Sequence, residues 1–116
     1  MDYWYKATVV KVYDGDTITV DVDLGFDMCF HDVKIRLHGI DTPEIRGEER
    51  PEGLVARDRV RELIMSKEVQ INTIRDRQGK YGRYLGIVFI PGEDGELINI
   101  NELLVKEGLA EEVDYD

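Results

Sequence analysis

Three acidic side chains stand where polar residues are hardest to explain as part of a core. Asp16 follows a predicted tight turn, Asp41 ends a predicted strand, and Glu44 begins a charged loop. Two carboxylates with a main-chain carbonyl and water form a set of hard oxygen ligands, which suits Ca²⁺ or Mg²⁺ better than zinc. Because the turn and the strand end belong to neighbouring strands, their acids are expected to converge on a divalent cation.

Two arginines accompany these acids in the sequence. Arg36 precedes Asp41 by five residues on the same predicted strand, and Arg83 ends a basic loop at residues 75–83. A guanidinium group binds phosphate through paired, planar hydrogen bonds, so the two arginines would bracket a phosphate. Taken singly, each piece is also explained as a hairpin turn, a strand stop with a capping acid, or a solvated arginine. Their joint occurrence in this order favours a phosphate-binding site.

The elements that must position these residues are predicted from periodicity. Alternating β-branched and aromatic residues predict strands, and apolar residues at helical spacing predict helices. The predicted strands cover residues 4–13, 17–24, 30–40, 69–74 and 84–90, and the predicted helices cover about 51–66 and 101–108. Five strands with a helix between the third and the fourth are the plan of an OB-fold barrel. We therefore expect a mainly β, α+β fold with a short C-terminal helix, and a generic α+β domain is the alternative.

Three local predictions accompany this plan. Residues 44–53 have no apolar period and contain Gly, Pro and charges, which is typical of a mobile surface loop. Asn101 is predicted to cap the C-terminal helix and Gly108 to end it. Cys29, the single cysteine, stands between two apolar residues, which indicates a buried thiol with no disulfide partner.

Histidine offers no site by spacing alone. His31 and His38 show no metal-ligand spacing with each other or with Cys29, so a structural or surface role is expected for both.

The charge distribution narrows the possible partners. The chain has 116 residues and a net charge of -10, a balance that ordinarily disfavours nucleic acid. Residues 93–116 contain nine acids and one base, so most of the negative charge belongs to them. Residues 54–83 contain eight bases and four acids, and this segment can still meet a polyanion.

Length and composition predict one unit over residues 1–116, with no membrane segment. The start lacks the pattern of a secretory signal, so a cytoplasmic location is expected, or a viral source or a trimmed mature domain.

In four blocks the sequence resembles the staphylococcal nuclease (thermonuclease) family. The blocks are DGDT at 14–17, IRLHGIDTPE at 35–44, KYGR at 80–83, and parts of 101–110, all in family order. The resemblance implies a five-stranded OB-type barrel and a calcium-dependent phosphodiesterase that cuts DNA and RNA and leaves 3′-phosphates. It also implies a nucleic-acid substrate, with single-stranded DNA or RNA preferred.

By motif position, the resemblance also implies a metal site and a base. Asp16 and Asp41 would ligate Ca²⁺ through their carboxylates, and Thr42 through its carbonyl. Glu44 would hold and deprotonate the attacking water.

The basic residues of the motifs receive substrate roles in the same way. Arg36 and Arg83 would bind the scissile phosphate and stabilise its transition state, and Lys80 and Tyr81 would contact a neighbouring phosphate. Residues 22–33 are longer than in the best-known member, so they would alter the rim of the site or form a contact surface.

Two other functions remain open on the sequence. One is a non-catalytic nucleic-acid- or protein-binding module that uses the same barrel, since fold alone does not settle function. The other is a structural subunit that pairs with a protein partner through the acidic C-terminal tail.

Overall fold

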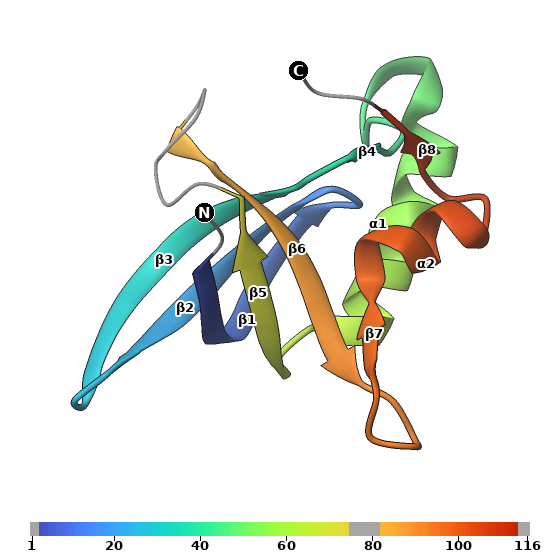
Figure 1. The fold of residues 1–116 in the computed structure, drawn as a ribbon. Helices are drawn as coiled ribbons and strands as arrows, with labels where there is room; N and C mark the ends of the chain where they lie inside the picture. The colour runs from blue at the N-terminus through green and yellow to red at the C-terminus, as the bar shows by residue number, and fades with distance from the viewer. Residues whose placement is uncertain (1–2, 75–81, 114–116) are drawn as a thin grey trace.

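The computed structural model describes residues 3–74 and 82–113, and its centre is a closed five-stranded barrel (Figure 1). The barrel strands are β1 (Tyr3–Asp14), β2 (Thr17–Gly25), β3 (Met28–Leu37), β5 (Glu68–Thr73) and β6 (Tyr84–Pro91). They pair in the order β3-β2-β1-β5-β6, and a parallel β3–β6 pairing closes the ring. The predicted OB-fold barrel is confirmed.

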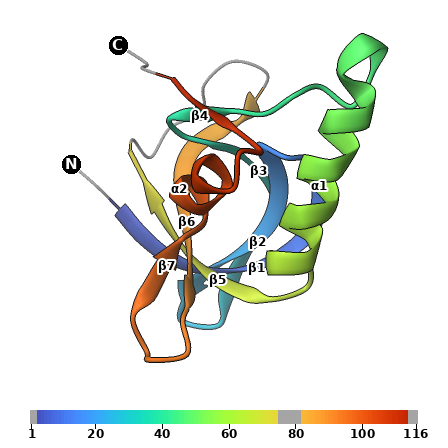
Figure 2. The same ribbon diagram turned by 90° about the vertical axis from the view of Figure 1, so that its right-hand side faces the viewer.

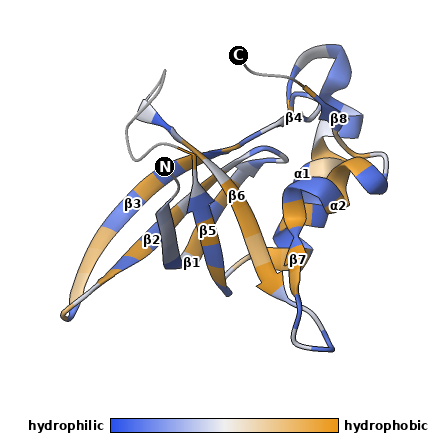
Figure 3. Ribbon diagram, viewed as in Figure 1, coloured by the Kyte–Doolittle hydropathy of each residue, from blue (hydrophilic) through white to orange (hydrophobic). Residues whose placement is uncertain are grey.

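Hydrophobic and hydrophilic residues alternate along the barrel strands (Figure 3), and the buried ones are mostly valine and isoleucine. On β2, Ile18, Val20 and Val22 are buried while the residues between them are not. This is the period of two that a strand with one buried face requires. A burial of this kind stabilises the fold by roughly 1.5–3 kcal/mol for each large aliphatic side chain.

Two helices complete the fold. Helix α1 (Arg50–Ile64) follows β3 and β4 in the chain and runs along one side of the barrel (Figure 2). Its buried residues, Gly53, Ala56, Val60 and Ile64, recur at helical spacing and form the face turned to the barrel. Helix α2 (Ile100–Lys106) is short, as predicted.

Four small elements were not predicted: β4 (Ile40–Asp41), a 3₁₀ turn (Gly47–Glu49), β7 (Leu97–Asn99) and β8 (Glu111–Glu112). The third strand ends at Leu37 rather than near residue 40, because the chain turns at Gly39 with φ +82°. It then resumes as β4, which pairs with β8. The segment predicted as a loop at 44–53 contains the 3₁₀ turn and the first residues of α1.

The predicted N-cap at Asn101 is wrong. Asn99 caps α2 instead, since its side chain accepts a hydrogen bond of 3.0 Å from the Glu102 N–H. Asn101 is buried, and its side chain forms hydrogen bonds with the barrel. Its amide oxygen accepts from the Val88 N–H at 3.2 Å, and its amide nitrogen donates to the His38 carbonyl at 2.9 Å. Sequence position alone does not distinguish two asparagines two residues apart.

Cys29 is exposed, so the prediction of a buried thiol is wrong as well. Its apolar neighbours lie on the projecting β2–β3 hairpin, where Met28 and Phe30 are also exposed.

Among the helices described, none has the length and apolar character needed to cross a membrane.

Candidate active site

The turn between β1 and β2 places Asp16. Its backbone N–H donates to Asp14 Oδ1 at 3.1 Å, which closes the Asp-Gly-Asp turn. Gly15 is buried at this turn, and a Cβ atom there would lie 2.8 Å from the Thr42 side chain and 2.9 Å from the Ala56 Cβ. Glycine therefore lets the turn pack directly against Thr42 and helix α1.

Asp16 then reaches across to the segment after β4. Its Oδ2 accepts a hydrogen bond of 3.0 Å from the Thr42 backbone N–H, and both residues are 6% exposed. This bond joins two segments that are far apart in the sequence. It fixes the carboxylate of Asp16 beside the main chain that carries Asp41 and Thr42.

Arg36 lies between the two acids. Its Nη2 is 3.3 Å from Asp16 Oδ2 and 3.3 Å from Asp41 Oδ1, and its Nη1 donates to the Leu37 and Ile40 carbonyls at 2.9 Å each. The guanidinium is held in a single orientation, because two carbonyl groups of the backbone turn accept hydrogen bonds from one of its terminal nitrogens. Only 13% of the Arg36 side chain is exposed, so its charge acts in a site largely closed to water.

The environment keeps Asp16 ionised. Burial by itself raises the pKa of Asp16, but the hydrogen bonds from Asp14 and the Thr42 N–H, with the Arg36 guanidinium, hold it below its ordinary value. This residue is a preformed carboxylate that points at the cluster.

The other acids of the cluster show the opposite shift. Burial, with the hydrogen bond and charge of Asp16, raises the pKa of Asp14 to about 6. Burial and the charge of Asp16 also raise the pKa of Asp41, against the opposing effect of Arg36. Negative charge is therefore crowded here beyond what one arginine neutralises, and an added cation would lower its free energy.

Arg83 joins the same cluster through a threonine. Its Nη1 donates to Thr17 Oγ1 at 3.4 Å, and the Thr17 hydroxyl donates to Asp16 Oδ1 at 3.2 Å. The parallel pairing of β3 with β6 brings this about, since Arg83 directly precedes β6 and Arg36 is near the end of β3. Two guanidinium groups 47 positions apart in the sequence thus serve one site.

Glu44 is exposed and lies three residues beyond Asp41, at the start of the segment that leads into α1. Its main chain packs on that helix, because a Cβ atom at Gly53 would lie 2.1 Å from the Glu44 carbonyl oxygen. The position of the Glu44 backbone is therefore fixed by α1.

The donor set of the cluster fits a hard divalent cation. The carboxylates of Asp16 and Asp41 and the main-chain carbonyl of Thr42 are the ligand types that Ca²⁺ takes, with water completing the shell. Burial and then the charge of Asp16 raise the pKa of Asp41, and a cation at that position would favour its ionised form.

The structure brings together four of the predicted site residues, Asp16, Arg36, Asp41 and Thr42, and links Arg83 to them. Lys80 and Tyr81 lie outside the described residues. Sequence reasoning assigned no role to Asp14 or Thr17, although both belong to the Asp-Gly-Asp-Thr block that signalled the turn.

Comparison with known sequences identifies related proteins. The profile of the family described as Staphylococcal nuclease homologue matches residues 34–116. Micrococcal nuclease of Shigella flexneri is 36% identical over 110 residues, which are 91% of this chain and 57% of that protein. Thermonuclease of Staphylococcus intermedius is 34% identical over 105 residues, 88% of this chain and 56% of that protein. The SPbeta prophage-derived endonuclease YokF of Bacillus subtilis is 36% identical over 108 residues, 90% of this chain and 33% of that protein. The chain thus spans about half, or less, of the length of these relatives.

Proposed function

The chain belongs to the staphylococcal nuclease homologue family, and from that premise we propose that it is a calcium-dependent nuclease. It hydrolyses phosphodiester bonds of DNA or RNA and leaves 3′-phosphates, with a single-stranded substrate preferred. The observation that carries the proposal is the cluster in which Arg36 contacts both Asp16 and Asp41. Relatives named as nucleases, about one third identical over most of this chain, support it.

The chemistry requires positive charge and a positioned base. A phosphodiester is anionic and repels a nucleophile, so cations must be aimed at the oxygens where charge builds up. Arg36 and Arg83 supply two guanidinium groups for this purpose, and their contacts with Asp16 and Thr17 orient them beforehand. When bound by Asp16, Asp41 and the Thr42 carbonyl, Ca²⁺ supplies further positive charge at the same phosphate.

Glu44 is the proposed general base. It removes a proton from the attacking water, and such assistance is typically worth about 10²- to 10⁴-fold in rate. Its exposure suits this role, since the water must arrive from solvent on the side opposite the leaving oxygen. Lys80 and Tyr81 are proposed to contact a neighbouring phosphate of the substrate.

The alternative is a non-catalytic module that binds nucleic acid or a protein partner, the latter through the acidic C-terminal residues. The net charge of -10 favours the protein-binding form of this alternative, because electrostatic attraction to a polyanion such as nucleic acid is weak. The intact acids favour the enzyme, because a pure nucleic-acid binder would gain affinity by neutralising Asp16 and Asp41 beside phosphate.

The direct test is degradation of single-stranded DNA in low salt with Ca²⁺, with Mg²⁺ and with chelator. We expect cleavage with Ca²⁺, none with chelator, and products that end in 3′-phosphate. Binding of DNA without cleavage under every metal condition would support the alternative.

A further inference from the structure

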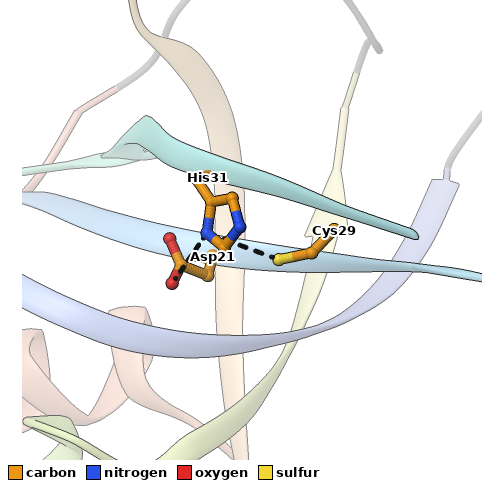
Figure 4. Close-up of side chains that lie close together, drawn as sticks. All are labelled: Asp21, Cys29 and His31. Carbon is orange, nitrogen blue, oxygen red and sulfur yellow. Dashed lines mark hydrogen bonds and ion pairs between the residues drawn. The ribbon is translucent and has the colours of Figure 1, made fainter. Parts of the chain in front are cut away.

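Away from the active site, three side chains with metal-ligating atoms converge on the β2–β3 hairpin (Figure 4). Asp21, Cys29 and His31 each offer one donor atom, and these atoms all lie within 4.8 Å of one another. None of the three was assigned a binding role from the sequence, because their separation along the chain matches no ligand spacing.

The register of β2 against β3 brings the three side chains together, and a β-bulge lies directly beside them. Val20 pairs with Val33 and Val22 with Phe30, so Asp21 on β2 faces two residues, His31 and Asp32, on β3. Asp32 adopts a left-handed conformation with φ +57°. Cys29 and His31 are two positions apart on β3 and so share a face, and the pairing of Val22 with Phe30 places Asp21 opposite His31.

Asp21 is also oriented by the bulge. Its Oδ1 accepts a hydrogen bond of 3.0 Å from the Asp32 N–H, and its Oδ2 lies 3.2 Å from His31 Nδ1. A backbone bond that fixes one carboxylate oxygen and leaves the other directed at the site is the arrangement found around ligated metals.

In either tautomer of His31, one conventional hydrogen bond accounts for only one of the two contacts that Nδ1 makes. His31 Nδ1 lies 3.2 Å from Asp21 Oδ2 and 3.7 Å from Cys29 Sγ. A ring nitrogen either donates one hydrogen bond or accepts one. When Nδ1 carries a proton and bonds Asp21 it has nothing for the thiol, and when it lacks the proton it faces the carboxylate unfavourably.

Two of the three donor separations match those expected around a tetrahedral metal ion. Bond lengths of about 2.3 Å to sulfur and about 2.0–2.1 Å to nitrogen and oxygen place sulfur and nitrogen about 3.6 Å apart, and nitrogen and oxygen about 3.3 Å apart. The observed separations of 3.7 Å and 3.2 Å agree with both values. The set of one thiol, one imidazole and one carboxylate is the borderline-soft chemistry of Zn²⁺ rather than that of Ca²⁺.

We propose that Asp21, Cys29 and His31 form a binding site for Zn²⁺ on the β2–β3 hairpin, with water as the fourth ligand. The ion links β2 to β3 part of the way along a hairpin that extends away from the helices (Figure 1). This site is separate from the active-site cluster, because Asp16 stands just before β2 and Asp21 is five residues farther along this extended strand, on the order of 16 Å away. Because a metal-bound thiol is a thiolate, binding of the ion releases a proton from Cys29.

The test titrates Zn²⁺ alone into the reduced, chelator-treated full chain, in competition with a chromophoric chelator, and repeats the titration with Co²⁺. We expect binding of one ion at this site and a Co²⁺ absorption spectrum with a thiolate-to-metal charge-transfer band. That band arises only when Cys29, the single cysteine, is a ligand. A Co²⁺ complex without the band would overturn the proposal.

Matched variants locate the ion. Asp21→Asn is expected to weaken Zn²⁺ binding by at least about tenfold, the smallest loss that follows from disturbing a metal ligand or its support. Asp23→Asn removes the same charge from the same strand but no donor of the cluster, and a much smaller loss is expected. Equal effects of the two variants, or full retention of Zn²⁺ by Cys29→Ser, would contradict the site. A loss that follows Asp41→Asn instead would place the ion in the active site, which also contradicts it.

Discussion

The carbonyl oxygen of Glu44 lies where a side chain at Gly53 would have to begin. A Cβ atom at Gly53 would be 2.1 Å from that oxygen and 2.5 Å from its carbon, so the loop and helix α1 meet backbone to backbone. The proposed general base is therefore positioned by a helix residue that has no side chain.

Gly53→Ala tests this contact. In a helix interior, replacement of glycine by alanine ordinarily stabilises by about 0.5–1 kcal/mol. Here the added methyl group collides with backbone, so we expect a loss of about 1–3 kcal/mol in the free energy of unfolding, together with slower cleavage. Denaturant unfolding and initial cleavage rates measure the two effects. Glu52→Ala, in the same helical turn and exposed, is the control, and a Gly53→Ala protein that is more stable and equally active would contradict the account.

Arg36→Lys tests the planar fork. Nη1 bonds two carbonyls while Nη2 contacts two carboxylates, and an ammonium group cannot reproduce this arrangement. We expect cleavage to fall about 10²- to 10³-fold, the cost of losing one preorganised donor to a developing charge. Arg57→Lys is the matched control, since Arg57 contacts its exposed neighbour Asp58. Full activity in Arg36→Lys would mean that only the charge at residue 36 matters.

Asn101→Asp tests the buried amide between α2 and the barrel. The amide nitrogen donates to the His38 and Gly86 carbonyls at 2.9 Å and 3.2 Å. A carboxylate at this position would face both carbonyls without a hydrogen to donate, so we expect a loss of about 2–4 kcal/mol in the free energy of unfolding. Thermal or denaturant unfolding measures it. Asn99→Asp keeps the capping oxygen and should change stability little, and similar losses in the two variants would argue against the assigned roles.

Glu107→Gln tests the link between α1 and the end of α2. Both Glu107 oxygens accept from Arg59 at 2.8 Å, and this hydrogen bonding, together with the charge of Arg59, lowers the pKa of Glu107 below 4.5 against the effect of burial. The folded state thus binds the Glu107 proton less tightly than the unfolded chain, so the pair stabilises at neutral pH. That stability is lost as the pH falls through the folded-state pKa.

We expect Glu107→Gln to lower the unfolding temperature by a few degrees at pH 7 and to match the unsubstituted protein in acid well below pH 4.5. Unfolding temperatures across this pH range are the measurement. Glu93→Gln, at an exposed position, should show no such pH-dependent difference, and a constant offset for Glu107→Gln at every pH would rule out the ion pair as its cause.

The order of the barrel strands and of both helices was predictable because their apolar residues alternate or recur at helical spacing. The short strands were not predictable, since two or three residues are too few to show an alternation of apolar and polar side chains. Pairing of Ile40–Asp41 with Glu111–Glu112 depends on contacts between distant parts of the chain. The exposure of Cys29 could not be predicted either, because the apolar neighbours of a residue on a projecting hairpin look like those of a core strand in the sequence.

Convergence of Asp16 with Asp41 was predictable from the turn, the strand end and their neighbouring strands. The hydrogen bonds from Arg36 to the Leu37 and Ile40 carbonyls were not predictable, because they depend on the turn at Gly39. The hairpin cluster was also hidden, since it depends on the cross-strand register that places Asp21 opposite His31. Spacing along one strand does not reveal a site that pairing between two strands creates.

Single-turnover cleavage of single-stranded DNA with saturating Ca²⁺, in Glu44→Gln against the unsubstituted protein, is the most direct test of the central claim. Loss of the base should slow cleavage by about 10²- to 10⁴-fold. DNA binding should be retained, and Glu48→Gln, an exposed position farther along the same segment, should cleave at the normal rate. If neither protein cleaves while both bind DNA, the proposed calcium-dependent nuclease is contradicted. If Glu44→Gln cleaves as fast as the unsubstituted protein, the role of Glu44 as general base is contradicted.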